Sequence, residues 1–227
     1  MTYKLAIFDW NGTLIDDSFA NLAGSNATFR AAGLPEITLE RYRDTMDFPL
    51  VHFYARNGLD TDTYLQKTDE LNAAFMDVYH EEQKKAPLRR HAMDVLDALL
   101  DKNITLMILS NHIQEHLEYQ LAERHVHAKF KHICGNQNFT SRELTRTNKM
   151  GRLQQVMEEF GYQAEEAFII GDSLEEPDIA HHLGMTSISV TWGCFSRTRL
   201  SASPTHFIID DLTELHDIVD KGTVAAE

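Results

Sequence analysis

Polar side chains that could carry out chemistry follow three short apolar runs of the sequence. Asp9 ends the first run, Ser110 and Asn111 follow the second, and Asp172 follows the third. A carboxylate can act as a nucleophile or bind a hard cation, and a hydroxyl or an amide can bond to an oxyanion. Together these residue types favour phosphoryl transfer through an aspartyl-phosphate, with Mg²⁺ as the cation.

A lysine and further acids accompany these positions. Lys149 opens a predicted helix, and Lys131 is its rival as the cation of the site. A lysine at a helix N-terminus is slightly unfavourable for the helix dipole, which favours a functional role for Lys149. Three acids, Glu175, Glu176 and Asp178, follow the third run, and carboxylate oxygens without softer ligands suit Mg²⁺.

A tight turn is predicted directly after Asp9. Asn11, Gly12 and Thr13 are typical turn residues. Backbone N–H groups and the threonine hydroxyl would then face the same space as the carboxylate, which suits an anionic ligand.

The apolar runs alternate with helical patterns beyond residue 90. Strands are predicted at residues 4–9, 104–109, 130–134, 167–170, 186–190 and 207–209, and helices at 92–101, 113–123, 149–160 and 177–183. Solid apolar strands that are each followed by a helix indicate a parallel sheet covered on both faces. A ligand of such a sheet binds outside the carboxyl ends of the strands, where Asp9, Ser110 and Asp172 would lie.

Residues 17–90 have a different pattern, with helices predicted at 20–32, 50–57 and 63–80 and no convincing strand. The sequence therefore predicts an α/β fold: a Rossmann-like parallel sheet with helices on both faces, plus an inserted all-helical cap domain. The core domain is predicted at 1–16 and 91–227, and the cap at 17–90 would cover the strand ends. Candidate anion contacts in the cap are Arg41, Arg43, His52 and Arg56.

The composition limits the classes of partner. The 227 residues carry 21 Lys and Arg against 35 Asp and Glu, a formal net charge of −14. Such a surface repels nucleic acid and anionic membranes, so we expect neither as a partner. Cys134 and Cys194 lie far apart and residues 1–9 lack a signal-peptide pattern, so we expect a cytoplasmic protein. The oligomeric state is left open.

Four motifs, spread over nearly the whole chain, resemble those of the haloacid dehalogenase-like (HAD) superfamily. They are FDWNGTL at residues 8–14, LSN at 109–111, the lone Lys149, and IGDSLEE at 170–176. Any one alone is weak, but four in the right order, three of them at strand ends, make a specific signal. The insertion is similar to the helical cap of phosphoglycolate-phosphatase-like members.

The resemblance implies a Mg²⁺-dependent phosphatase acting on a small phosphorylated metabolite. Asp9 would be the nucleophile that takes the phosphoryl group. Ser110, with Asn111 beside it, would bond to the phosphoryl oxygens, and Lys149 would offset charge on both carboxylate and phosphate.

The same resemblance implies the remaining ligands. Gly12 and Thr13 belong to the phosphate-binding turn. Mg²⁺ would be held by Asp9, the backbone carbonyl of Asn11, Asp172 and Glu176, with Glu175 and Asp178 as alternatives to Glu176.

One residue departs from the family pattern. Phosphatases of the family usually carry an Asp two residues after the nucleophile as general acid and base, and this chain has Asn11. General acid–base help is worth about 10²–10⁴-fold, so slow hydrolysis of esters with poor leaving groups is expected. Two alternatives remain open. One is a phosphonatase-like enzyme with a Schiff-base lysine from Lys67, Lys84 or Lys85, and the other is a non-catalytic ligand-binding protein.

Overall fold

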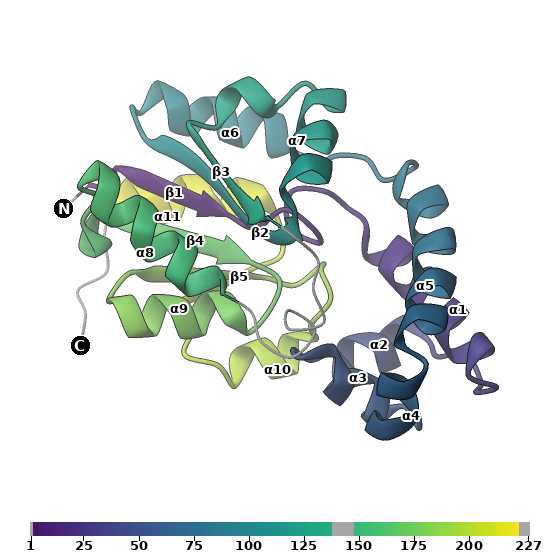
Figure 1. Cartoon of the computed structure of the whole chain (residues 1–227). Helices are drawn as coiled ribbons and strands as arrows, with labels where there is room; N and C mark the ends of the chain where they lie inside the picture. The colour runs from purple at the N-terminus through teal and green to yellow at the C-terminus, as the bar shows by residue number, and fades with distance from the viewer. Residues whose placement is uncertain (1, 138–147, 223–227) are drawn as a thin grey trace.

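A six-stranded parallel sheet forms the centre of the structure, a computed structural model that describes residues 2–137 and 148–222 (Figure 1). Residues 1, 138–147 and 223–227, part of the predicted core range, lie outside the described residues. The strands are β1 (Leu5–Phe8), β2 (Thr105–Ile113), β3 (His132–Asn136), β4 (Ala167–Gly171), β5 (Thr186–Val190) and β6 (Phe207–Ile209), in the order β3-β2-β1-β4-β5-β6. The predicted Rossmann-like α/β fold is confirmed, and the strand order reverses between β1 and β4.

Helices cover both faces of the sheet because successive strand residues point to opposite sides. Ala6 and Phe8 face the apolar cluster shared with α6 (Ala92–Asp101), α7 (Gln114–Glu123) and α11 (Leu215–Lys221). Leu5 and Ile7 face the cluster shared with α8 (Lys149–Phe160) and α9 (Glu175–Leu183). With both faces buried, the polar groups at the strand ends remain available at one rim.

Between β1 and α6 the chain forms a separate helical body (Figure 1). Its helices are α1 (Ser18–Ala31), α2 (Leu39–Thr45), α3 (Leu50–Arg56), α4 (Thr61–Gln66) and α5 (Thr68–Gln83). Their apolar cluster includes Phe29 and Phe53, and it extends to Phe195 and Leu200 next to and within α10 (Arg197–Ser201). The insertion thus packs against the segment that follows β5.

The two segments that join the insertion to the sheet run side by side. Ile15 forms an antiparallel bridge with Leu88. The Asp16 N–H donates to the carbonyl of Pro87 at 3.0 Å, and the Arg89 N–H donates to the carbonyl of Leu14 at 2.8 Å. These bonds tie the entry and the exit of the insertion together.

Several predicted boundaries were wrong. Helix α2 was not predicted, and residues 63–80 form two helices that meet at Lys67 rather than one. Strand β2 runs on to Ile113, with a register shift between Leu109 and Ile113 in its pairing with β3. Ser110 and Asn111 therefore lie in this irregular stretch of the strand rather than after it.

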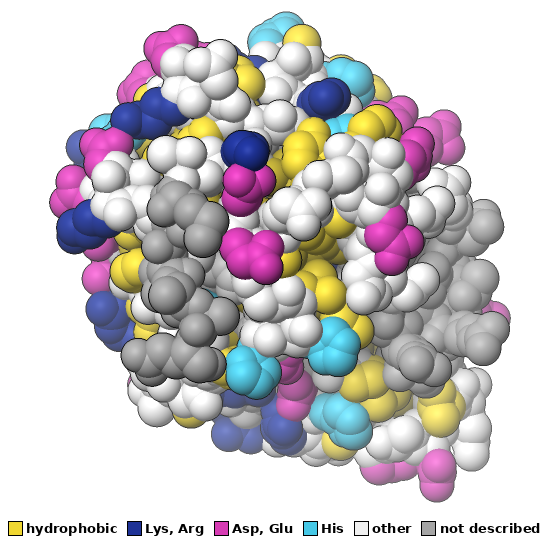
Figure 2. Space-filling model, turned by 90° about the vertical axis from the view of Figure 1, so that its left-hand side faces the viewer, with side chains coloured by type: hydrophobic (Ala, Val, Ile, Leu, Met, Phe, Trp, Pro, Cys, Tyr) yellow, Lys and Arg dark blue, Asp and Glu magenta, His cyan; other side chains and the backbone are white. Residues whose placement is uncertain are grey.

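The surface, the cysteines and the helices add three observations. On the face shown in Figure 2, acidic and basic side chains are interspersed. Both cysteines, Cys134 and Cys194, are free thiols. Among the described residues, no helix combines the length and the apolar character needed to cross a membrane.

Candidate active site

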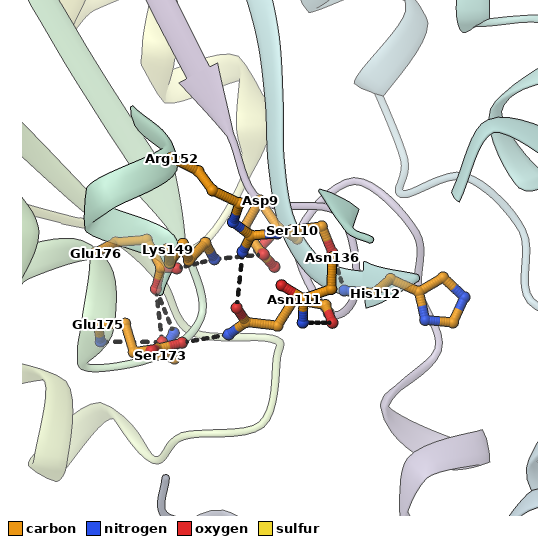
Figure 3. Close-up of polar contacts among 12 residues, drawn as sticks. Asp9, Ser110, Asn111, His112, Asn136, Lys149, Arg152, Ser173, Glu175 and Glu176 are labelled. Carbon is orange, nitrogen blue, oxygen red and sulfur yellow. Dashed lines mark hydrogen bonds and ion pairs between the residues drawn. The ribbon is translucent and has the colours of Figure 1, made fainter. Parts of the chain in front are cut away.

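Lys149 lies between two buried carboxylates at the carboxyl ends of β1 and β4 (Figure 3). Its Nζ donates to Asp9 Oδ1 at 2.7 Å and also to Glu176 Oε1. Lys149 is 3% exposed and Glu176 is fully buried. The structure thus places Lys149 beside Asp9, whereas Lys131 is exposed and lies over the ring of Phe160.

Charge in this cluster is not balanced. The pKa of Asp9 is raised to about 8, chiefly by burial; Lys149 lowers it, and the carboxylates of Glu176 and Asp172 raise it. Burial also raises the pKa of Asp172, to about 6. Burial alone would raise the pKa of Glu176, but contacts with Lys149 and Ser173 lower it. Three buried carboxyl groups thus share one lysine. A further positive charge at this place would stabilise their ionised forms.

Asp172 lies where two loops approach without side chains. Its Oδ2 accepts a hydrogen bond from the Cys194 N–H at 2.7 Å. A Cβ built on Gly12 or on Gly193 would overlap the Asp172 side chain. Gly12 also has φ +69°, a conformation that other residues rarely adopt. The loops after β1 and β5 can therefore close on the carboxylate only through glycine.

The donor set fits Mg²⁺, although no group of three acidic, histidine or cysteine side chains among the described residues forms a ready metal site. Both oxygens of Glu176 are engaged, one by Lys149 and the other by Ser173 Oγ at 2.7 Å. Asp9 is bonded to Lys149 through Oδ1 and, at 3.3 Å, to Thr13 through Oδ2, and Asp172 is bonded to Cys194 through Oδ2. Mg²⁺ is usually bound by one or two carboxylates, water and substrate phosphate, so Asp9 and Asp172 supply enough carboxylates. Metal binding by Glu176 and by the Asn11 carbonyl stays a prediction.

The stretch of β2 that carries Ser110 and Asn111 is held by its neighbours (Figure 3). Ser110 Oγ accepts from the His112 N–H at 3.1 Å. Asn111 Nδ2 donates to Glu175 at 2.7 Å, and Asn111 Oδ1 accepts from Arg152 at 3.1 Å. Both residues line the same cavity as Asp9, so the structure brings these predicted phosphate ligands together.

The turn after Asp9 is organised by a carboxylate that the sequence analysis did not single out. Asp17 is fully buried; its Oδ1 accepts from the Gly12 N–H and its Oδ2 from Asn11 Nδ2, each at 2.7 Å. Tyr79 of α5 also donates to Asp17 Oδ2, at 3.1 Å. Thr13 is fully buried too, does not line the cavity, and donates to Asp9 Oδ2 at 3.3 Å.

One sequence signal could have revealed Asp17. It is an acid at the N-cap of a helix, eight residues after the candidate nucleophile and three residues after the end of the first motif. Tyr79 carries no such signal, because only the fold brings α5 to the turn after β1. The pKa of Asp17 is raised, chiefly by burial, so the amide of Asn11 has a carboxyl partner that resists ionisation.

The remaining candidates do not reach the cavity. Arg43 donates to the carbonyls of Trp192 and Gly193, and Arg41 donates to the carbonyl of Arg56. The lysines proposed for a Schiff base also lie elsewhere: Lys84 and Lys85 pair with Glu81 and Glu82, and Lys67 is exposed. His52 and Asp178 are exposed and absent from the lining as well.

A cavity of about 420 Å³ joins the strand ends to the insertion. Its lining combines the cluster around Asp9 with residues from all five inserted helices. This arrangement gives a buried carboxylate bonded to a lysine, with further carboxylate oxygens beside it, at one end, and space for an organic group at the other.

A family model described as haloacid dehalogenase-like hydrolase matches residues 6–190. Curated relatives include the phosphoglycolate phosphatase of Vibrio vulnificus, 26% identical with 95% of this chain and 96% of the relative covered. The phosphoglycolate phosphatase of Agrobacterium fabrum is also 26% identical, with 98% and 97% covered.

Solved structures share the fold. A haloacid dehalogenase-like family hydrolase from Streptococcus pneumoniae superposes with a TM-score of 0.78 at 22% identity, covering 95% of this chain and 98% of that one. A predicted phosphoglycolate phosphatase from Haemophilus somnus gives a TM-score of 0.70 at 18% identity, covering 96% and 98%. Both similarities extend over the sheet and the inserted helices.

Proposed function

The chain belongs to the haloacid dehalogenase-like hydrolase family, and on that premise we propose that it is a Mg²⁺-dependent phosphatase acting on a small phosphate monoester. The observation that carries this proposal is the buried Asp9 carboxylate, bonded to Lys149 beside Asp172 at the head of a cavity. The names of the curated relatives support the reaction class.

In the proposed reaction, one carboxylate oxygen of Asp9 attacks phosphorus, a new O–P bond forms, and the bond from phosphorus to the alcohol oxygen breaks. The alcohol oxygen then takes a proton from solvent. Water next attacks the phosphorus of the aspartyl-phosphate, inorganic phosphate leaves, and the carboxylate is regenerated. Lys149 offsets negative charge on Asp9 and on the phosphoryl oxygens, and Ser110 and Asn111 orient those oxygens.

We assign the metal to Asp9, Asp172 and the main-chain carbonyl of Asn11. Metal binding by Glu176 stays a prediction, because both of its carboxylate oxygens already bond to Lys149 and Ser173. Mg²⁺ bound there neutralises charge on the carboxylates and on the phosphoryl group. The excess of buried negative charge supports this assignment, because a phosphate dianion would otherwise enter a site that already holds three carboxylates and one lysine.

We also propose that residues 17–90 act as a cap that recognises the organic part of the substrate, a small phosphorylated metabolite. Its helices supply much of the cavity wall.

We also propose a cytoplasmic location, because both cysteines are free thiols. No observation favours the phosphonatase alternative, since none of Lys67, Lys84 and Lys85 lines the cavity.

The test is steady-state hydrolysis of p-nitrophenyl phosphate, with Mg²⁺ and with EDTA. This ester has a good leaving group, so Asn11 does not mask an intact nucleophile. We expect metal-dependent turnover that Asp9→Asn abolishes and that the control Asp178→Asn, at an exposed acid outside the cavity, retains. Turnover that persists in Asp9→Asn contradicts the mechanism, and no turnover by the unmodified protein favours the non-catalytic alternative.

A further inference from the structure

The cavity has two chemically different ends. Asp9, Lys149, Asp172 and Glu176 form the charged end at the sheet. Six aromatic residues of the inserted helices form the other end: Tyr42, Phe53, Tyr54, Tyr64, Phe75 and Tyr79. Tyr79 connects the two ends, because its hydroxyl bonds to Asn11 and Asp17. A phosphoryl group bound at the sheet would direct the organic part of its ester toward these rings.

The aromatic end is built as a packed wall. Tyr54 stacks on Tyr64 with ring centroids 4.7 Å apart, and Phe75 stacks on Tyr79 at 5.4 Å. An apolar cavity of roughly 150 Å³ is sufficient to bind benzene. The cavity of about 420 Å³ therefore accommodates a ring or a branched chain in addition to a phosphoryl group.

Cations are missing from this end. Among the described residues that line the cavity, Lys149 is the one lysine or arginine, and it is already bonded to Asp9 and Glu176. The arginines of α2 and α3 bind backbone carbonyls and Asp47 instead. A ligand carboxylate at the aromatic end would meet neutral donors such as Asn72 and Ser25 but no lysine or arginine among the described lining residues, which is unfavourable for a charge taken out of water.

Two imidazoles, His112 and His116, also line the cavity. The pKa of His112 is lowered to about 4, chiefly by burial, so its ring is neutral near pH 7. An ordinary imidazole is neutral at about pH 8, so measurements there remove any contribution from a charged histidine.

We propose that the substrate is a phosphate monoester of an uncharged, largely apolar alcohol that carries an aromatic or branched aliphatic group, and that carboxylate-bearing esters such as phosphoglycolate are excluded. This inference rests on the proposed phosphatase function. The proposed substrate differs from phosphoglycolate, after which the curated relatives are named.

The test compares two esters of primary alcohols with similar leaving groups, 3-phenylpropyl phosphate and 4-phosphonooxybutanoate, with Mg²⁺ at pH 8. We expect kcat/KM to be about 100-fold higher for the phenyl ester, equivalent to about 2.7 kcal/mol. Phosphoglycolate should be as poor as the carboxylate ester. A ratio below about tenfold, or a preference for phosphoglycolate, overturns the inference while the phosphatase function stands.

Binding measurements keep the inference testable if the phosphatase function fails. The phosphonates 4-phenylbutylphosphonate and 5-phosphonopentanoate cannot be hydrolysed at an ester bond, and calorimetry with Mg²⁺ gives their affinities without turnover. The phenyl compound should bind at least tenfold more tightly, and equal affinities overturn the inference.

A variant tests the cause of the selectivity. Met76→Lys, on the cavity side of α5, introduces a cation of similar length and should raise kcat/KM for 4-phosphonooxybutanoate at least tenfold. Leu65→Lys, half-exposed on α4 and outside the cavity, should leave the ratio unchanged. Asn72→Lys, also in the lining, is the second variant if Met76→Lys fails to fold. Unchanged selectivity in a folded cavity variant contradicts the argument.

Discussion

Asn11 occupies the position where related phosphatases usually carry the catalytic acid, and its amide is bound to Asp17. The contact from Asn11 Nδ2 to Asp17 Oδ2 is 2.7 Å, and Tyr79 bonds to both residues. In this chain the amide stands at the position of the catalytic acid, and the carboxyl group lies behind it, buried and with a raised pKa. The acid and the amide are therefore exchanged relative to a site in which an amide supports an exposed acid.

Reversing the pair should create the missing acid. Asn11→Asp alone places two carboxyl groups in contact, where they share one proton, so kcat on 3-phenylpropyl phosphate should rise less than about tenfold. The double variant Asn11→Asp/Asp17→Asn restores an amide donor to the new carboxylate, and kcat should rise about 100-fold. Steady-state kinetics of the unmodified protein, Asn11→Asp, Asp17→Asn and the double variant measure the coupling.

Hydrolysis of p-nitrophenyl phosphate is the control for this cycle. Its leaving group needs little acid help, so its kcat should change by less than about threefold in the double variant. A full gain from Asn11→Asp alone would show that Asp17 does not restrain the new acid.

At the scale of elements, two loops depend on glycine to reach Asp172. Gly12 combines the close approach with a positive φ, whereas Gly193 shows the close approach without it. Gly184 shows the reverse, with φ +77° and nothing within 4 Å of a Cβ. Alanine variants at these positions can therefore distinguish the effect of backbone strain from the effect of crowding Asp172.

Gly193→Ala should lower kcat/KM for p-nitrophenyl phosphate about 100-fold, because a displacement of about 1 Å in Asp172, the carboxylate proposed to bind the metal, is enough to do so. Gly184→Ala should lower the free energy of unfolding by about 1–2 kcal/mol and leave kcat/KM unchanged. Urea unfolding and steady-state kinetics on both variants check this. Equal losses of activity in the two variants would contradict the role given to the glycine at residue 193.

The elements also show how far the sequence could predict the fold. The solid apolar runs of β1, β2 and β4 fixed the parallel sheet, and the positions of Asp9 and Asp172 at strand ends placed them at one rim. The helix LERYRDT at Leu39–Thr45 has no apolar stripe, and it is held by the burial of Tyr42 in a tertiary cluster. A local pattern could not predict it.

The same limit applies to the site. Asp9 and Lys149 are 140 residues apart in sequence, yet both could be predicted because each begins or ends an element at the rim. Tyr79 lies within α5, and Asp17 follows the turn after β1. No strand end indicates in the sequence that these two residues are in contact. The aromatic end of the cavity likewise depends on how the five inserted helices pack.

At the scale of the whole molecule, the buried carboxylates connect stability to pH. The pKa of Asp9 in the folded chain, about 8, lies above the ordinary value of 3.8. Between these two values the native state binds more protons than the unfolded state, so stability falls as pH rises. The contribution is fully present below about pH 4 and is lost as pH approaches 8.

In EDTA, the free energy of unfolding of the unmodified protein relative to Asp9→Asn should therefore fall by a few kcal/mol between pH 4 and pH 8, each pKa unit corresponding to about 1.36 kcal/mol. Urea unfolding at each pH measures this difference. Mg²⁺ at about 100 times its dissociation constant should add about 2.7 kcal/mol to the unmodified protein at pH 8. A difference that is flat with pH, or no stabilisation by Mg²⁺, contradicts the charge imbalance.

The paired entry and exit of the insertion have an evolutionary consequence. Since Ile15 bridges Leu88 and the neighbouring backbone groups are bonded to each other, the two ends of the inserted body leave the sheet at one point. A segment of another length and shape could be grafted there without shifting a strand, provided that it covers Phe195 and Leu200. Preference for the organic group can then diverge among descendants while the reactive centre is inherited intact.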